Sequence, residues 1–455
     1  MTAERVDSNK MGEMPVKKLL LDMGIPMMIS MMVQALYKVV DGIFVARISE
    51  NALTAVSMAF PMQNLIIAFS VGNGVGINAL LSRALGSGDP DRANRVAKNG
   101  LFLQGLSYLM FLMLGIFAAE PFMKSQSTDA EIISFGVTYL HIVLCLSLFV
   151  FGEISFERLL QSTGRTKYSM YTQLCGAIFN IVFDPILIFG LLGFPAMGIA
   201  GAAAATVGGQ AFGMIVGLIL NRKKNPEINL SMKGFRPSGE MIGEMCRVSV
   251  PSIAMPAVFS TTVFFMDLIL KKFSSTAVAV LGVYFKLESI VFMPVFGLNN
   301  AIVPIIAFNY GADRADRVHE TLKYGLIYVS SFLLAGFLLM QLIPDKMMLL
   351  FNAGDNMLKL GVPALRIISL SFIFAGVGIV FSSGCQAFGY ATYSLLIAVA
   401  RQFVVLLPVA WLLSLTGNLS NVWYSYLVAE VVSVTLAVPL LGRAMKKTGM
   451  QKAKN

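Results

Sequence analysis

Ionisable side chains inside otherwise apolar stretches are the residues of this sequence with the clearest capacity for chemistry. A charged group at the centre of a bilayer costs at least ~2.5–3.5 kcal/mol on insertion scales. Each such residue is therefore a candidate for binding protons, metal cations or charged ligands. The set comprises Lys38, Asp41, Glu153, Asp184, Asp267, Lys286, Glu288, Arg366 and Arg401, with His141 as the one histidine in an apolar stretch.

Two of these acids, Asp41 and Asp184, are expected at comparable depth in the membrane. At 1.5 Å per residue, Asp41 lies about 8 Å and Asp184 about 14 Å below the predicted outer ends of their helices. Asn180 lies one turn deeper than Asp184 on the same helical face, and Thr206 on the next helix reaches a similar depth. Such a group can hold a proton shared between carboxyls or bind Na⁺ through oxygen, so we predict a cation site. The competing interpretation is two unrelated acids, each satisfied locally.

A second set of side chains is a candidate lining for a substrate cavity. Met31 and Gln34 share a helix, and Phe60 lies on the next one. Flexible thioethers and aromatic rings suit a pocket for varied apolar cations, although packing and lipid contact are the more common explanation for any single one of them. Lys286 and Glu288 are two residues apart on a later helix and so face different sides. They either line the cavity or pair with other helices.

The composition places the elements that carry these residues in lipid. Hydrophobic residues make up 56% of the 455 residues and charged residues 13%, against roughly 45–50% and 25% in soluble domains. Apolar stretches of about 20 residues or more recur, as a hydrocarbon core of ~30 Å requires. We predict an all-α integral membrane protein with twelve transmembrane helices, near 18–46, 52–82, 93–119, 132–157, 169–193, 196–221, 241–270, 277–308, 318–343, 357–386, 391–414 and 422–444.

The sequence repeats itself with a shift of 225 residues. Pro26 matches Pro251, Gly72 matches Gly297, and Asp91-Arg92 matches Asp316-Arg317. This repeat predicts two lobes of six helices each. Because six is an even number, both lobes enter the membrane from the same side, and the repeats are parallel, related by an axis along the membrane normal. The predicted organisation is an N-terminal segment (1–17), an N-lobe (18–221), a linker (222–240), a C-lobe (241–444) and a tail (445–455).

The repeat breaks at the candidate cation site. Asp41, Asn180 and Asp184 find Met266, Val405 and Val409 at the equivalent positions. A residue needed only for the folding of a lobe would be expected in both lobes, whereas an ion site is needed in only one lobe. The asymmetry therefore favours a functional site in the N-lobe.

The net charge of +10 reflects membrane topology. Basic residues concentrate in alternate loops, for example Arg158, Arg165 and Lys167 in one of them. By the positive-inside rule, both termini and the linker are cytoplasmic in a multi-pass protein of the plasma (bacterial inner) membrane. This distribution argues against a nucleic-acid partner. The expected partners are a small organic molecule and the lipid bilayer, and we expect a monomer.

Cysteine and histidine give little scope for enzymatic chemistry. Cys145, Cys175, Cys246 and Cys385 form no C-x-x-C pair, and the only histidines are His141 and His319, with no H-E-x-x-H. A membrane-embedded enzyme is accordingly disfavoured, and we expect no cofactor and no permanently bound metal.

Several runs of residues resemble the multidrug and toxic-compound extrusion (MATE) family over essentially the whole chain. They are Phe179-Asn180-Ile181-Val182-Phe183-Asp184-Pro185, Val40-Asp41-Gly42-Ile43-Phe44-Val45 after Pro26, Gln161-Ser162-Thr163-Gly164, and Val303-Pro304-Ile305-Ile306-Ala307-Phe308-Asn309-Tyr310-Gly311. Details resemble the prokaryotic MepA-like and DinF-like members.

The resemblance implies a twelve-helix, two-lobe antiporter that exports drug-like, often cationic compounds against inward H⁺ or Na⁺. It assigns the N-lobe cation site to Asp41, Asn180, Asp184, Tyr139 and Thr206. It also implies that protonation there bends the first helix at Pro26, which would act as a hinge. The C-lobe departs from the sodium-coupled branch, because its tenth helix carries Arg366 and no acid.

Other transport classes remain as alternatives at this stage. A flippase for a lipid-linked or amphipathic substrate is closest in chemistry. A major-facilitator transporter has the same helix count, but the residues after Arg92 do not complete its loop motif. A channel fits hydropathy alone, although two lobes with buried carboxylates favour alternating access.

Overall fold

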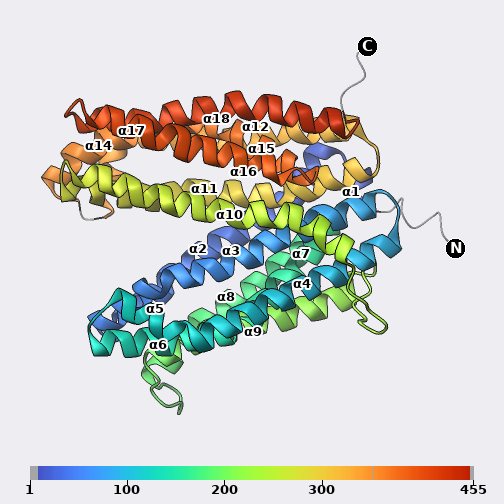
Figure 1. Cartoon of the computed structure of the whole chain (residues 1–455), viewed down its shortest axis with the longest axis horizontal. Helices are drawn as coiled ribbons and strands as arrows, with labels where there is room; N and C mark the ends of the chain where they lie inside the picture. Colours follow the sequence, from blue (N-terminus) through green and yellow to red (C-terminus); the bar gives the residue numbers. More distant parts are fainter. Residues whose placement is uncertain (1–8, 352, 451–455) are drawn as a thin grey trace. The chain divides into compact units, whose positions relative to one another are not determined.

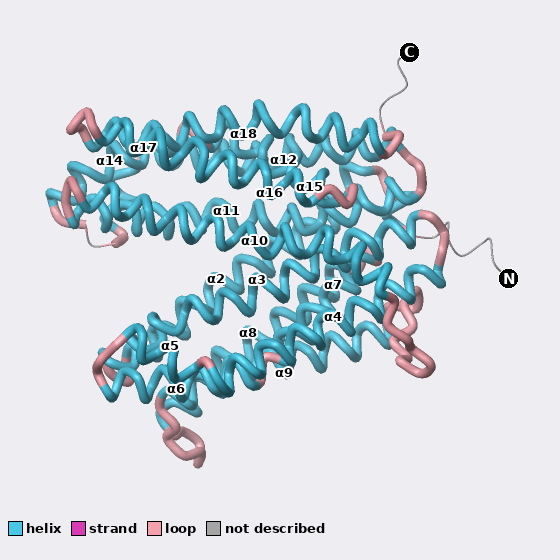
Figure 2. The backbone as a smooth tube through the Cα atoms, in the orientation of Figure 1, coloured by secondary structure: helices cyan, strands magenta, loops and turns pink. Residues whose placement is uncertain are grey.

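The computed structural model describes residues 9–351 and 353–450, and parts of the predicted terminal segments 1–17 and 445–455 lie outside them. The described residues are helical, with connecting turns and no strand (Figures 1 and 2). The first half contains α1 (Lys10–Glu13), α2 (Val16–Ala46), α3 (Glu50–Gly86), α4 (Pro90–Phe117), α5 (Ala119–Gln126), α6 (Ala130–Cys145), α7 (Leu148–Ser162), α8 (Thr166–Phe189) and α9 (Ile199–Lys224). The second half contains α10 (Gly239–Lys271), α11 (Ser275–Gly311), α12 (Ala315–Leu342), α13 (Pro344–Leu349), α14 (Asp355–Ser369), α15 (Phe372–Ala387), α16 (Ala391–Val399), the π-helix η1 (Ala400–Leu406), α17 (Leu407–Ser414) and α18 (Leu419–Lys447).

Within the described residues, ten helical segments are long and apolar enough to cross a membrane on their own. Two helix pairs bring the number to twelve if each pair is one span. These are α6 with α7, bent by 44°, and α14 with α15, bent by 48°. The prediction of an all-α protein with twelve spans is confirmed, with the fourth and tenth spans broken in the middle.

The sequence repeat recurs in the helix boundaries. α3 and α11 each contain 37 residues, and α4 and α12 each contain 28, with starts and ends 225 positions apart. The caps recur as well, because Ser49 accepts a hydrogen bond from the Ala52 amide and Ser274 accepts one from the Ala277 amide. A side-chain oxygen at this position satisfies an amide that the first helical turn leaves unpaired.

One helix departs from the repeat. The eighth helix, α8, is an uninterrupted α-helix, whereas its equivalent at 391–414 is divided into α16, the π-helix η1 and α17. A π-helical segment inserts extra backbone per turn and commonly marks a functional or strained position. Asn180 lies in the part of α8 that corresponds to η1, so the backbones differ where the side chains also differ.

Contacts divide the chain into two compact units, which comprise residues 1–28 with 250–455 and residues 29–249. These units differ from the predicted lobes at two places. α2 changes unit after Met28 and α10 after Ser249, in each case within three residues of a repeat-related proline, Pro26 or Pro251. Proline removes an internal helical hydrogen bond and permits a bend, which explains why packing changes there.

Glycines allow close helix packing in the unit 29–249. Gly209 faces the Gly176 carbonyl of α8, and Gly217 faces Phe156 of α7 and Thr172 of α8. A Cβ at Gly201 would lie 2.5 Å from the backbone oxygen of Leu187. Gly209, Gly213 and Gly217, which follow one another at four-residue spacing on α9, thus form a face that lets the neighbouring helices approach. This packing brings α7, α8 and α9 together around the candidate site.

In the unit 1–28 with 250–455, the first half of α2 packs closely on α11. A Cβ at Gly24 would lie 2.5 Å from Leu298 Cδ1, and one at Gly297 would lie 2.5 Å from Met28 Cα. The start of the described chain is held on the same unit, where Arg317 Nη2 donates to the carbonyl oxygens of Met11 and Met14 at 3.0 and 2.8 Å.

Replacing Gly297 by Ala is expected to destabilise the protein by about 1–3 kcal/mol, because the new methyl group meets the backbone of α2. The matched control is Gly282→Ala in the same helix, where no atom lies within 4 Å of an added Cβ. That control should be neutral or up to ~1 kcal/mol stabilising through helix propensity. Thermal unfolding of the purified protein in detergent measures both, and equal midpoints would contradict the packing described here.

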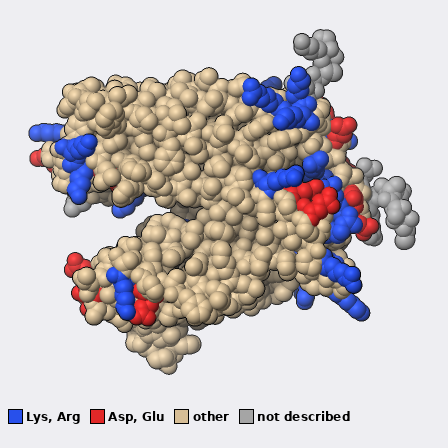
Figure 3. Space-filling view, in the orientation of Figure 1, with Lys and Arg blue, Asp and Glu red and all other residues tan. Residues whose placement is uncertain are grey.

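The charge distribution fits membrane-spanning helices. On the face shown in Figure 3, Lys, Arg, Asp and Glu side chains gather at the helix ends, and the flanks between them are uncharged.

One prediction about these charges is wrong. Arg158 was expected in a cytoplasmic loop, but it lies inside α7 and is only 6% exposed. A polar environment inside the unit compensates its charge there.

Candidate functional site

Asp41 and Asp184 lie together inside the unit 29–249. Asp41 projects from the second half of α2 and Asp184 from α8, and their carboxyl groups are within hydrogen-bonding reach of each other. Asp184 is fully buried. Two buried carboxylates at this separation repel each other, so one shared proton or a bound cation is needed to stabilise the pair.

Asn180 and Thr206 extend this pair on α8 and α9. Asn180 Nδ2 lies 3.4 Å from Asp184 Oδ1 and 3.5 Å from Thr206 Oγ1, which are long for hydrogen bonds. Thr206 Oγ1 donates to the Ala202 carbonyl at 3.0 Å, as a helical threonine commonly does. Gly209 allows the approach, since an added Cβ there would lie 3.3 Å from Asn180 Cβ.

Tyr139 of α6 completes the group. It is 2% exposed, lies within electrostatic range of both aspartates, and its hydroxyl accepts a hydrogen bond from Gln63 Nε2 of α3. Its ring belongs to an apolar core with Phe111 and Phe151, which holds the hydroxyl in position. The structure therefore brings together all five residues predicted for the cation site.

Several oxygen atoms in the site lack a hydrogen-bond donor. Asp41 Oδ1, Asp184 Oδ2 and Asn180 Oδ1 are buried and accept no hydrogen bond from the described residues. Buried acceptors without a donor are costly, so a proton or an oxygen-binding cation at this place would stabilise the structure. The described residues contain no cluster of three or more His, Cys, Asp or Glu able to hold a metal ion. A pair of carboxyls with neutral oxygens around it can bind a proton or a monovalent cation.

The predicted cavity residues are distributed over both units. Gln34 and Met31 are partly buried on α2, and Phe60 on α3 is 51% exposed, all in the unit 29–249. Glu288 and Lys286 belong to the other unit, on α11. The Lys286 ammonium lies 5.7 Å from the ring centre of Phe351, and Glu288 is hydrogen-bonded with Tyr284.

A partly buried ion pair lies near Glu288. Arg401 of η1 contacts Glu430 of α18, with 2.6 Å between Arg401 Nη1 and Glu430 Oε1. Glu430 was not among the residues selected from the sequence, although it too interrupts an apolar helix. Its other oxygen, Oε2, is buried and accepts no hydrogen bond from the described residues.

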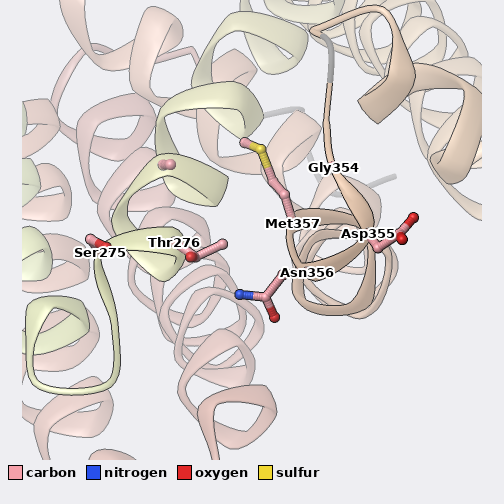
Figure 4. A pocket seen from close by; sticks show the side chains of 7 residues that line it. Ser275, Thr276, Gly354, Asp355, Asn356 and Met357 are labelled. Atoms are coloured by element: carbon pink, nitrogen blue, oxygen red, sulfur yellow. The ribbon is translucent and has the colours of Figure 1, made fainter.

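One pocket on the described surface is separate from these groups. It has a volume of about 550 Å³ and is lined by Ser275, Thr276 and Ala279 of α11 and by the start of α14 with Gly354 (Figure 4). None of the predicted site residues lines it. It is a shallow surface feature at the helix ends and gives no support for a substrate site.

The fold and its paired carboxyls, in a chain with up to twelve apolar spans, define a multi-pass membrane transporter of duplicated architecture. The family described as MatE matches residues 26–186 and 251–412, two segments that begin 225 positions apart. The chain belongs to the MatE family.

Curated relatives and solved structures agree with this assignment. The chain is 24% identical over 442 residues to the multidrug export protein MepA of Staphylococcus haemolyticus, covering 97% of this chain and 96% of that protein. It is 23% identical to MepA of Staphylococcus aureus, with 93% of each covered. Since these relatives are named export proteins, the comparisons place the chain among transporters and not among enzymes.

Two solved structures show the same fold. An outward-facing multidrug resistance MATE family transporter of the MOP superfamily has a TM-score of 0.90 and 23% identity, covering 99% of this chain and all of that one. A MOP superfamily transporter from Pyrococcus furiosus, described as having reverse polarity of its binding pocket, has a TM-score of 0.89 and 23% identity, with both chains fully covered. The two-lobe, twelve-helix fold class is confirmed.

Proposed function

We propose that this protein is a secondary antiporter of the plasma membrane that exports drug-like, often cationic organic compounds in exchange for inward H⁺ or Na⁺. The observation that carries the proposal is the contact between the carboxyls of Asp41 and Asp184, surrounded by Asn180, Thr206 and Tyr139. The coupling cation binds there. No further cofactor is required.

Alternating access couples the two fluxes. Cation binding lowers the negative charge of the carboxyl pair, and cation release restores it, so the two states of the site favour different conformations of the protein. Pro26 provides the bend in α2, because this helix also carries Asp41 and changes unit immediately after the proline. Gln34, Met31 and Phe60 contribute an apolar and polarisable lining for the substrate.

The topology proposed with this function has both termini and the 222–240 linker in the cytoplasm. Basic residues at those places support it through the positive-inside rule. The transporter acts as a monomer.

Imposing one gradient at a time on reconstituted vesicles tests the proposal. Vesicles containing the protein and ethidium as the substrate should accumulate or expel the dye when either a proton or a sodium gradient is imposed, and not without a gradient. Failure of both gradients to move the dye uphill would contradict the proposal. Gradient-independent movement of a fluorescent lipid between leaflets would instead favour the flippase alternative.

A further inference from the structure

Buried and half-buried polar side chains continue from the cation site along α7 and α8 to the opposite end of these helices (labelled in Figure 1). We call this set the polar line. Its members are Asp184, Asn180, Glu153, Gln173, Glu157, Gln161 and Ser169. Asp184 and Ser169 are 15 residues apart on α8, or about 22 Å along its axis. All members belong to the unit 29–249.

Along the polar line from the cation site, the first carboxyl is that of Glu153. It lies between Gly176 of α8 and Gly213 of α9, so that a Cβ at Gly176 would be 3.1 Å from Glu153 Oε1 and one at Gly213 would collide with it. Gly176 is one helical turn from Asn180, which is one turn from Asp184. The two glycines therefore leave a slot for a carboxyl group next to the cation site.

The second carboxyl is that of Glu157, one turn further along α7. It is 3% exposed, and its Oε2 accepts a hydrogen bond of 2.8 Å from Gln173 Nε2. Among the described residues, Arg158 lies within electrostatic range of Glu157, and Tyr37 lies within range of both Glu153 and Glu157. Two carboxyls four residues apart in a membrane helix destabilise it. Such a pair is therefore a candidate for a function.

Beyond Glu157 the line reaches the end of the unit that carries Arg165 and Lys167. Arg158 Nη1 donates to Gln161 Oε1 at 2.8 Å, and Gln161 Nε2 donates to Ser169 Oγ at 2.9 Å. Gln161 and Ser169 are fully buried. These hydrogen bonds continue the line to the first turn of α8.

The polar line also contains buried acceptors that lack a donor. Asn180 Oδ1, at the cation site, and Gln173 Oε1, next to Glu157, accept no hydrogen bond from the described residues. Both side chains are more than nine-tenths buried. Such oxygens need a donor, which water or a protonated carboxyl can supply. Because two buried oxygens at different positions along the polar line lack a donor, the line is suited to transferring protons.

We infer that Glu153 and Glu157 carry the coupling proton from the Asp41–Asp184 pair to the cytoplasmic end of the unit. The proton leaves the pair, which becomes two carboxylates again. Glu153 and then Glu157 each accept and release it, and it is passed to water at the end of the line. The inference rests on the proposed function and commits the cation to H⁺, because single hydrogen-bonding groups along a line transfer protons, whereas Na⁺ needs a cage of oxygens.

Glu153→Gln and Glu157→Gln test this inference in reconstituted vesicles, because glutamine keeps the size of the side chain but cannot take up a proton. Proton-driven ethidium transport should fall at least about 10-fold in each variant. Exchange of labelled for unlabelled substrate at equal pH, which moves no net proton, should persist. Glu153→Asp should restore part of the driven transport. Glu120→Gln, on the exposed helix α5, is the matched control and should behave like the wild type.

Three outcomes would overturn the inference: wild-type driven transport in both glutamine variants, equal loss of exchange and driven transport, or transport driven by sodium alone. In the first and third cases the proposed antiport still stands. Failure of the antiport itself is recognised separately, by wild-type protein that moves ethidium uphill under neither a proton nor a sodium gradient.

Discussion

Replacing Asp41 or Asp184 by Asn is expected to reduce coupled export by roughly 100-fold or more, the upper part of the range for coupling between two sites. Asparagine has nearly the same shape as aspartate but carries no charge, so each variant keeps one carboxyl where the wild type has two. The site can then no longer hold a proton or cation between two carboxyls, and the conformational cycle loses its driving force. Both carboxyls are needed, because they are in contact and hold the proton or cation between them.

Vesicle transport under a proton or a sodium gradient measures this loss, with membrane insertion checked on the same preparations. Asp267→Asn is the matched control, because it makes the same chemical change in the other unit, at a residue that is not one of the paired carboxyls. It should retain most of the coupled export. Wild-type export in Asp41→Asn and Asp184→Asn would exclude the proposed site.

The second large effect concerns stability. Replacing Arg401 by Leu leaves the carboxylate of Glu430, which is 12% exposed, without its partner. Removing one member of a buried pair costs about 3–5 kcal/mol, and we expect about 3 kcal/mol because Arg401 is 32% exposed. The double variant Arg401→Leu/Glu430→Leu should recover most of the loss, since two apolar side chains replace two charges.

Thermal unfolding in detergent of the single and double variants forms a double-mutant cycle. The exposed pair Lys124–Glu120, at 2.6 Å with side chains 61% and 58% exposed, is the control, and Lys124→Leu should cause no measurable change. A double Arg401/Glu430 variant as unstable as the single one would show that the loss does not come from leaving the Glu430 carboxylate unpaired.

The fold could be predicted from the sequence because hydropathy and the 225-residue repeat are strong, local signals. The helix ends of α3 and α11 obey the repeat, as do those of α4 and α12. The bends in the fourth and tenth spans could not be predicted, because Leu146-Ser147 and Leu370-Ser371 carry no proline or glycine. The π-helix η1 also has no sequence signature of its own.

The cation site was predictable in part. Asp41 and Asp184 stand out because charge is rare in apolar spans, and the failure of the repeat at both positions separates them from structural acids. Gln63, which donates to Tyr139, was missed because an uncharged amide in a long helix has many possible partners. Glu157 and Arg158 were missed because they are near a helix end, where charged residues are normally exposed to solvent.

Proton release on substrate binding is the most direct test of the central claim that the Asp41–Asp184 pair binds the coupling ion. Purified protein in weakly buffered detergent, with a pH indicator, should release protons when ethidium is added, and Asp41→Asn and Asp184→Asn should release none. If the cation is Na⁺, a sodium indicator should show the same pattern. Equal release of either ion by the wild type and both variants would contradict the account.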